Sequence, residues 1–435
     1  MPKLHPRALL STLSAVMACT CAHAAEPART PPAIVDVPSQ VGIMVGMPPL
    51  PENQVNLRNY ATPRFMRWTL SHMSSVFSTE RVSRGSGMPV ALPQGPALDV
   101  DALSVDWQGQ KITMTQAYRL LGADALLVLH RGQLVFERYF GDVTPATVHA
   151  TNSCTKSFVG TLAVTLAQEG KLDLKAPASR YVPELAASAL GSATVQELLD
   201  MRANFRIGDD VHQAGSLQVG ALQAYGVLPR PADYAGPDGA IAMMLAAKAT
   251  TPHGTGPMRY DNGSAEAVGW VLSRVTGKSV PELIGERLWQ PIGAERDGDF
   301  LLDSRKTPIA AFGLQASARD LARFGEMIRR QGRVGDRQVL PAAAIDEIRR
   351  GGDRAAFAAS GDAAVLPGGS YHDFWWFNHD ALDSFQCQGQ FAQRVWIAPK
   401  AETVIVLLSA DPDASRSREP LRLTAFRTIA GALNR

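Results

Sequence analysis

The chain has 435 residues, of which 46% are hydrophobic and 19% are charged, a composition that is typical of globular proteins and excludes a disordered or fibrous chain. Beyond residue 24, 41 basic residues balance 41 acidic residues, because the first 24 residues contain Lys3 and Arg7 and no acid. Without an excess of positive charge the chain lacks the electrostatic signature of nucleic-acid binding, so we expect no nucleic-acid partner.

Residues 1–24 have the pattern of a signal peptide. A positively charged start precedes an apolar stretch from Ala8 to Ala18, and Ala22-His23-Ala24 offers a cleavage site between small residues. The apolar stretch is too short to span a bilayer, and no later segment is apolar enough to be a transmembrane helix. We expect cleavage near Ala24/Ala25 and a periplasmic or secreted protein, with lipidation at Cys19 as the alternative.

In residues 25–168 the sequence pattern predicts an extension, a hairpin and a helix. Residues 25–105 form an N-terminal extension with one helical stretch around 64–77. Two β-prone runs at 124–130 and 134–140 flank a short Gly turn and predict a hairpin. From 152 to 168, apolar residues recur at four-residue spacing and predict a helix that ends before Gly170.

The second half predicts helices and then strands. A capping box at 194–197 starts a helix, and most periodic segments between 174 and 299 are helical. Runs at 394–398 and 403–409 predict a second hairpin, followed by a closing helix over 421–433. We therefore expect an α/β (α+β) fold in which residues 106–173 and 300–435 build one antiparallel sheet from both termini, with flanking helices. A mostly helical subdomain, residues 174–299, completes it.

Ser153 and Lys156 form an S-x-x-K motif at the start of the predicted helix. Positions i and i+3 share a helix face, so the two side chains can touch. A serine hydroxyl needs a base, and a lysine that burial has deprotonated is a suitable one. The alternative is a helix-capping Ser followed by an exposed Lys, but the strongly apolar helix favours a buried lysine.

Two further segments supply candidate site residues. Tyr260 and Asn262 stand on a Gly/Pro-rich loop before a helix, where a tyrosine can relay a proton and an asparagine can bind a substrate carbonyl or a lysine. The second segment, residues 386–390 (QCQGQ), precedes the last hairpin. One of its backbone N–H groups, together with that of Ser153, would form an oxyanion hole. The simpler interpretations are a turn asparagine and an ordinary strand entry.

Two cysteines, Cys154 and Cys387, lie beyond residue 24. Two cysteines are too few for a disulfide framework, and their spacing is not that of a zinc site. We expect them to be small packing residues, and we expect no metal and no cofactor. A thiol hydrolase using Cys154 is disfavoured because Lys156, two residues away, would face elsewhere on the helix.

Taken in order, S-x-x-K, Y-x-N and a final strand motif resemble the serine β-lactamase and penicillin-binding protein superfamily. The resemblance covers roughly residues 50–435 and is closest to the class-C-type branch that includes 6-aminohexanoate-dimer (nylon-oligomer) hydrolases and related esterases. The segments that carry it are PRFMRW (63–68), SCTKSFVGTLAVTLAQEGKLDL (153–174), YVPEL (181–185), ATVQELLDM (193–201), GLQASARDLARFG (313–325) and GSYHDFWWF (369–377).

The resemblance implies a nucleophilic Ser153, a Lys156 base, a Tyr260 relay and an Asn262 anchor for substrate or lysine. The third motif has two registers, of which the preferred one assigns the oxyanion N–H to Cys387 and the other assigns it to Gln390. The resemblance also implies a β-lactamase/transpeptidase-like fold and acyl-enzyme hydrolysis.

Departures from the family pattern favour an ester or linear amide as the small-molecule substrate. No Lys or His occupies the third-motif position that helps to bind the carboxylate of β-lactams and cell-wall peptides. The loop 205–211 lacks the tyrosine of nylon hydrolases, which favours esters over that amide. The alternatives are a D,D-peptidase or β-lactamase and, from another class, a catalytically silent protein that binds cell-wall fragments or partners.

Overall fold

The computed structural model describes residues 37–207, 216–413 and 416–434. The predicted signal peptide, its cleavage site and the alternative lipidation site lie outside these residues, as do residues 208–211 of the loop without tyrosine. Among the helices of the described residues, none is both long and apolar enough to cross a membrane.

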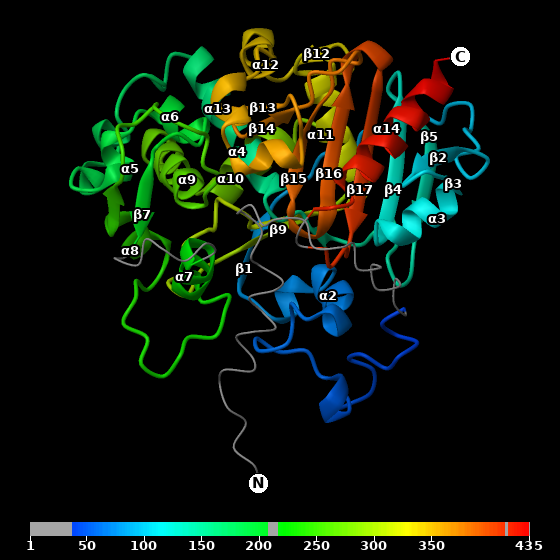
Figure 1. Ribbon diagram of the computed structural model, residues 1–435, viewed down its shortest axis with the longest axis horizontal. Coiled ribbons are helices and arrows are strands. Elements are labelled where there is room, and N and C mark those ends of the chain that lie inside the picture. The colour runs from blue at the N-terminus through cyan, green and yellow to red at the C-terminus, as the bar shows by residue number, and fades with distance from the viewer. Residues whose placement is uncertain (1–36, 208–215, 414–415, 435) are drawn as a thin grey trace.

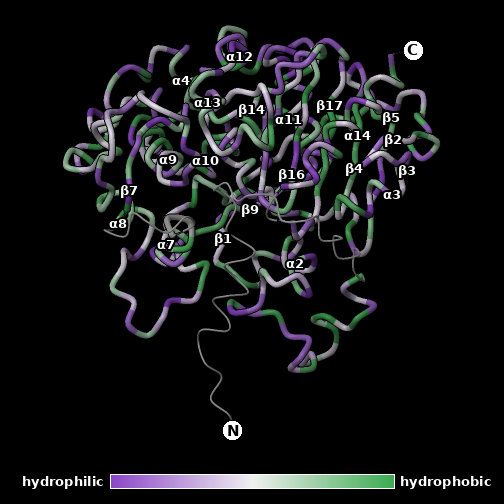
Figure 2. The backbone as a smooth tube through the Cα atoms, viewed as in Figure 1, coloured by the Kyte–Doolittle hydropathy of each residue, from purple (hydrophilic) through white to green (hydrophobic). Residues whose placement is uncertain are grey.

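A seven-stranded antiparallel sheet forms the centre of the molecule, in the order β13-β14-β15-β16-β17-β4-β5 (Figure 1). Strand β17 pairs with β4, with Val406 opposite Leu127, so the two ends of the chain meet in the middle of the sheet. Figure 2 shows β4 and β17 as hydrophobic segments, as expected for strands covered on both faces. The sheet assembled from both termini is thus confirmed. Its strands are β4 (Ala123–His130), β5 (Gln133–Tyr139), β13 (Ser370–His372), β14 (Trp375–Phe377), β15 (Phe385–Gly389), β16 (Gln393–Ala398) and β17 (Thr403–Ser409).

Helices cover both faces of this sheet. On one face, Gly325 of α11 (Ala318–Arg329) lies so close to the sheet that a Cβ would press on Val395 and Val404. On the other, Trp396 packs against Phe426 of α14 (Glu419–Leu433), with ring centroids 5.8 Å apart. Adjacent residues of β16 therefore face opposite layers, as strand geometry requires. The remaining elements around the sheet are α3 (Met114–Leu120), α4 (Cys154–Gln168), α12 (Ala342–Arg349), α13 (Arg354–Ala358), β2 (Ser104–Trp107), β3 (Gln110–Thr113), β11 (Arg333–Val334) and β12 (Arg337–Gln338).

The predicted subdomain of residues 174–299 is mostly helical, as expected. The capping box at its start is present, with Thr194 and Glu197 bonding each other's backbone N–H groups. One short strand pair, β7–β8, interrupts the helices. The elements are α5 (Ala189–Ser192), α6 (Val195–Leu199), α7 (Ser216–Tyr225), α8 (Ala240–Leu245), α9 (Gly263–Thr276), α10 (Val280–Ile284), β7 (Phe205–Ile207) and β8 (Ala247–Ala249).

A second sheet joins the N-terminal extension to the rest of the fold. Its strand order is β1 (Thr79–Val82), β9 (Gly298–Leu301), β10 (Leu314–Ala316) and β6 (His149–Ala150). The extension is therefore part of the same packed structure. Its helix α2 (Pro63–Leu70) is shorter than the predicted 64–77, and a 3₁₀ turn at Met73–Ser75 follows.

Candidate active site

Ser153 lies at the point where β6 turns into α4. Asn152 adopts a left-handed conformation with φ of 48°, and Ser153 is the N-cap residue of the helix. This turn leaves Ser153 partly exposed, whereas the residues from Cys154 to Leu166 are all buried. The first backbone N–H groups of α4 point toward the same region and favour a developing negative charge.

Lys156 is buried one turn further along α4, with 1% of its surface exposed. Its Nζ donates hydrogen bonds to Ser153 Oγ at 3.3 Å, to Asn262 Oδ1 at 2.8 Å and to the Ala311 carbonyl oxygen at 3.0 Å. Burial lowers the pKa of Lys156 to about 7, although the charges of Asp261 and Glu266 oppose the change. A lysine with this pKa is largely unprotonated just above neutral pH and can accept the proton of Ser153.

Tyr260 lies beside both residues. Its ring centroid is 4.8 Å from Lys156 Nζ, and it lines the same hollows as Ser153. Burial raises the pKa of Tyr260 well above its usual range, so the phenol stays protonated at neutral pH. A protonated phenol can donate a proton, so Tyr260 is suited to relaying one.

Glu266 and Ala311 were not predicted from the sequence. Buried Glu266, on α9, accepts hydrogen bonds from the backbone N–H groups of Ala310 at 2.9 Å and Ala311 at 3.1 Å. Ala311 in turn accepts the hydrogen bond from Lys156 through its carbonyl oxygen. Glu266 thus positions the segment that holds the lysine. The sequence signal that could have revealed Glu266 is an acidic residue inside the apolar run of residues 264–272. The role of Ala311 depends on its backbone carbonyl group, which leaves no signal in the sequence.

At the third motif, the structure places Gln390 next to the nucleophile. Asn152 Nδ2 donates to the Gln390 carbonyl oxygen at 2.9 Å, and Gln390 lines two hollows together with Ser153. A Cβ at Gly389 would collide with the Thr151 carbonyl oxygen, so glycine permits this close approach. Cys387, which the preferred register assigned to the oxyanion hole, lines neither hollow.

Cys154 and Cys387 form a disulfide, with their Cα atoms 4.8 Å apart. The expectation of two small packing residues was wrong, because the bond joins residues separated by 233 positions and nothing local reveals it. The disulfide links the first residue of α4 to the middle of β15. It also removes Cys154 as a thiol nucleophile.

The two hollows beside Ser153 differ in character. One, of about 130 Å³, is lined mostly by apolar side chains, with Asn152, Ser153, Tyr260, Asn262 and Gln390 among its polar residues. The other, of about 70 Å³, shares Ser153, Tyr260 and Gln390, and adds a polar wall that includes Gln388, Arg394, Asp413 and Arg422. The predicted residues Ser153, Lys156, Tyr260, Asn262 and Gln390 thus come together at one place.

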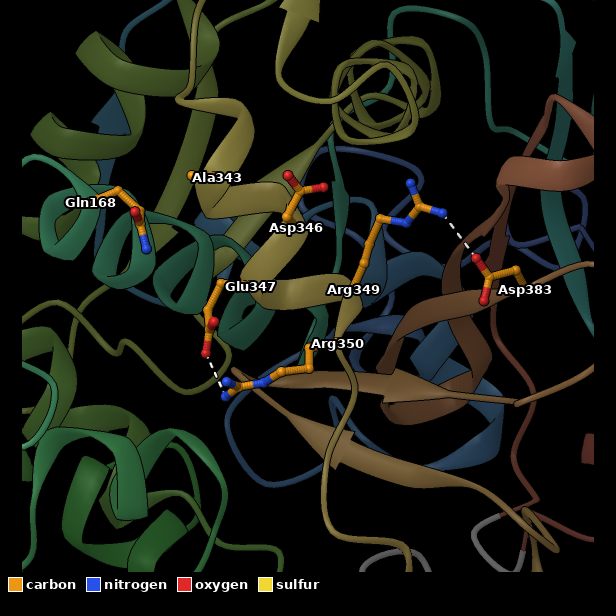
Figure 3. Close-up of a pocket in the computed structure, with 7 residues that line it drawn as sticks. All are labelled: Gln168, Ala343, Asp346, Glu347, Arg349, Arg350 and Asp383. Carbon is orange, nitrogen blue, oxygen red and sulfur yellow. Dashed lines mark hydrogen bonds and ion pairs between the residues drawn. The ribbon is translucent and has the colours of Figure 1, made fainter.

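A larger, open hollow of about 680 Å³ lies elsewhere, at α12 and the end of α4 (Figure 3). Four of its charged side chains form ion pairs: Arg349 bonds Asp383 at 2.9 Å and Arg350 bonds Glu347 at 2.5 Å. None of the predicted catalytic residues lines it, so it is not the site of the chemistry.

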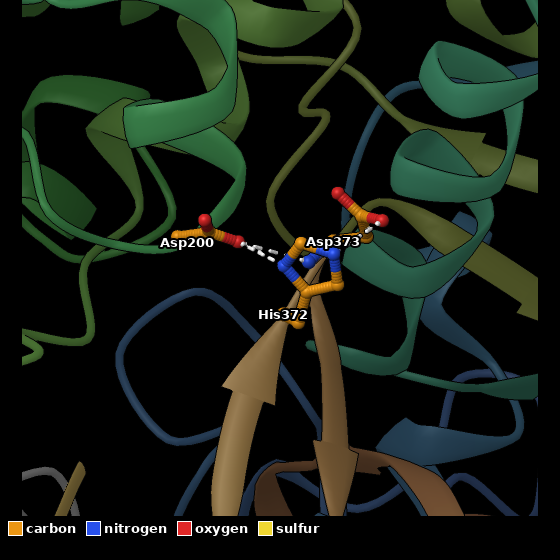
Figure 4. A group of neighbouring side chains, drawn as sticks. All are labelled: Asp200, His372 and Asp373. Carbon is orange, nitrogen blue, oxygen red and sulfur yellow. Dashed lines mark hydrogen bonds and ion pairs between the residues drawn. The ribbon is translucent and has the colours of Figure 1, made fainter. Parts of the chain in front are cut away.

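Among the described residues, Asp200, His372 and Asp373 form the one group of His, Cys, Asp and Glu side chains close enough to hold a metal ion (Figure 4). The carboxylates approach different ring nitrogens of His372, Asp200 at 2.7 Å from Nδ1 and Asp373 at 3.2 Å from Nε2. Burial alone would lower the pKa of His372, but the Asp200 hydrogen bond and the Asp373 charge raise it to about 9. The His372 ring thus lies as an imidazolium between two carboxylates. The group links Asp200, at the end of α6, to the turn between β13 and β14.

The fold and this constellation define a serine hydrolase of the β-lactamase type. A family model described as Beta-lactamase matches residues 110–427, and the chain belongs to that family. It is 29% identical, over 80% of this chain and 86% of the relative, to a 6-aminohexanoate-dimer hydrolase of Paenarthrobacter ureafaciens.

Solved structures agree with this assignment. A Bacillus anthracis protein assigned as a 6-aminohexanoate-dimer hydrolase matches with a TM-score of 0.81 and 30% identity, covering 88% of this chain and 98% of that one. A family VIII carboxylesterase matches with a TM-score of 0.53 at 18% identity, covering 77% of this chain and 99% of that one, which shows the shared fold alone. The resemblance seen in the sequence is therefore confirmed.

Proposed function

We propose that the protein hydrolyses a carboxylic ester or a linear amide through an acyl-enzyme on Ser153. The observation that carries this proposal is the buried Lys156, whose Nζ lies 3.3 Å from Ser153 Oγ. Burial holds the pKa of this amine near 7, so the base is available at neutral pH next to the hydroxyl that needs it.

In the proposed acylation step, Ser153 Oγ bonds to the substrate carbonyl carbon and its proton passes to Lys156. The carbonyl oxygen becomes an oxyanion, and we assign its stabilisation to the backbone N–H groups of Ser153 and Gln390. Tyr260, which lines the same hollows as Ser153, relays the proton to the leaving oxygen or nitrogen as the bond to it breaks. Water then attacks the ester on Ser153, gives up a proton through the same groups and releases the acid.

We further propose that the protein is exported. The charged start, apolar stretch and small-residue cleavage site of residues 1–24 support a cleaved leader. The disulfide between Cys154 and Cys387 supports an oxidising compartment, because such bonds persist outside the cytosol. N-terminal sequencing of the mature protein tests this: a start near Ala25 supports export with cleavage there, a lipidated start at Cys19 overturns that cleavage site alone, and a leader that is retained whole contradicts export.

A fluorophosphonate probe tests the nucleophile. The purified protein should gain one adduct, found on the peptide that contains Ser153, and Ser153→Ala should abolish both labelling and turnover of a p-nitrophenyl ester. Ser86→Ala, at an exposed serine, is the matched control and should behave as the wild type. An adduct on another residue contradicts the proposal, and a parallel panel of esters, linear amides and β-lactams sets the reaction class.

A further inference from the structure

The N-terminal extension forms much of the apolar hollow beside Ser153. Seven of its residues line the hollow, Thr69 and six with apolar or aromatic side chains: Tyr60, Ala61, Met66, Leu70, Met73 and Phe77. They come from α2 and its flanking turns, which Figure 1 shows below the main sheet. All seven precede residue 110, where the match to the family model begins. The proposed catalytic residues and this N-terminal wall of the hollow therefore come from different stretches of the chain.

Residues from outside the N-terminal extension add further apolar lining. Leu222, Val227 and Phe312 line the hollow from the helical region and the loop before β10. Thr69, a polar residue on the N-terminal side, uses its hydroxyl to donate to the Tyr60 carbonyl oxygen at 2.9 Å. No charged side chain of the described residues lines this hollow. A charged substrate group would lose its hydration there without gaining a partner.

We propose that this hollow is the acyl-binding site and that it selects an uncharged, apolar acyl group. The inference rests on the proposed acyl-enzyme function and names its substrate class. Its volume of about 130 Å³ approaches that of an apolar protein cavity of roughly 150 Å³ that binds benzene. A benzoyl group, or an aliphatic chain of similar volume, is therefore the expected size.

The polar hollow that also contains Ser153 suits the leaving group and water. Its wall includes Gln388, Arg394 and Asp413, which offer hydrogen-bond partners that a water molecule requires. The acyl group stays bonded to Ser153 after the first step, whereas the alcohol must leave before water enters. The apolar hollow can therefore hold the acyl group, and the polar hollow can accommodate the departing alcohol and then water.

Steady-state kinetics on p-nitrophenyl esters test the inference. We expect kcat/KM for benzoate to exceed that for acetate at least tenfold, and hexanoate to exceed 6-aminohexanoate at least a hundredfold, because the ammonium cannot be solvated in the hollow. In contrast, a series of benzoate esters with alcohols of increasing size should vary by less than fivefold.

Variants of the N-terminal wall should move this preference in opposite directions. Ala61→Leu fills the hollow and should lower the benzoate-to-acetate ratio of kcat/KM at least tenfold, whereas Met73→Ala enlarges it and should shift the optimum to longer acyl chains. Met88→Ala, at a methionine that is 88% exposed, is the matched control.

The outcomes separate this inference from the proposed function. Fluorophosphonate labelling of Ser153 with equal kcat/KM for all acyl groups, or with selectivity in the alcohol series instead, overturns the acyl site and leaves the acyl-enzyme standing. Loss of labelling and of all ester turnover in the wild type overturns both.

Discussion

The acid side of the pH–activity profile reports directly on Lys156. With a pKa of about 7, unprotonated lysine makes up about 90% of the total at pH 8, against about 0.3% for a lysine with its usual pKa, a gain of about 300-fold in available base. Activity should therefore rise with pH and level off above pH 8, with a midpoint near pH 7, because the neutral amine is the reactive form.

Lys156→Arg removes this base while keeping a positive charge, since a guanidinium is not deprotonated in proteins. We expect kcat/KM for a p-nitrophenyl ester at pH 8 to fall at least about 1000-fold, the range that loss of a general base produces. Lys171→Arg is the control, because Lys171 is exposed just beyond the same helix and should retain full activity. Circular dichroism and thermal melting check that both variants fold. A wild-type midpoint above pH 9, or an Arg variant that keeps a tenth of the activity, refutes the reasoning.

Three further results are expected. Tyr260→Phe should lower kcat about 100-fold with KM changed by less than threefold, because the lost hydroxyl relays a proton and does not bind the ground state; a large change in KM alone contradicts this role. Cys387→Ser should lower the free energy of unfolding in urea by about 2–5 kcal/mol, the usual effect of losing a native disulfide. Dithiothreitol should destabilise the wild type similarly and leave the variant unchanged. For His372, whose folded pKa is raised to about 9, the contribution to stability is fully present below pH 6.5 and is lost as pH rises through 9. The free energy of urea unfolding should decrease from pH 6 to pH 10, and the decrease should be smaller in His372→Asn; an identical decrease in that variant contradicts the assignment.

The sequence predicted those parts of the molecule that depend on local pattern. The hairpins at β4–β5 and β16–β17 and the helix that starts at Ser153 follow from apolar periodicity and turn residues, and all three are present. The roles of Tyr260 and Asn262 came from the family resemblance, and the structure places both beside Lys156.

The features that the sequence did not reveal depend on contacts between distant residues. The pairing of β1 with β9 and the disulfide have no local signature. The register of the third motif was ambiguous because one glycine fits two alignments. In the structure Gln390 lines the hollows beside Ser153, whereas Cys387 does not. The contribution of α2 to the apolar hollow was hidden for the same reason, because it depends on tertiary packing.

The construction of the sheet from both ends of the chain sets when activity can begin during synthesis. Ser153 and Lys156 are translated early, but β15, which carries Cys387 and leads into Gln390, follows more than 230 residues later. A nascent chain that stops before β15 has the nucleophile without its neighbouring strand and cannot close the disulfide. Completion of the site therefore depends on a strand that is translated near the end of the chain.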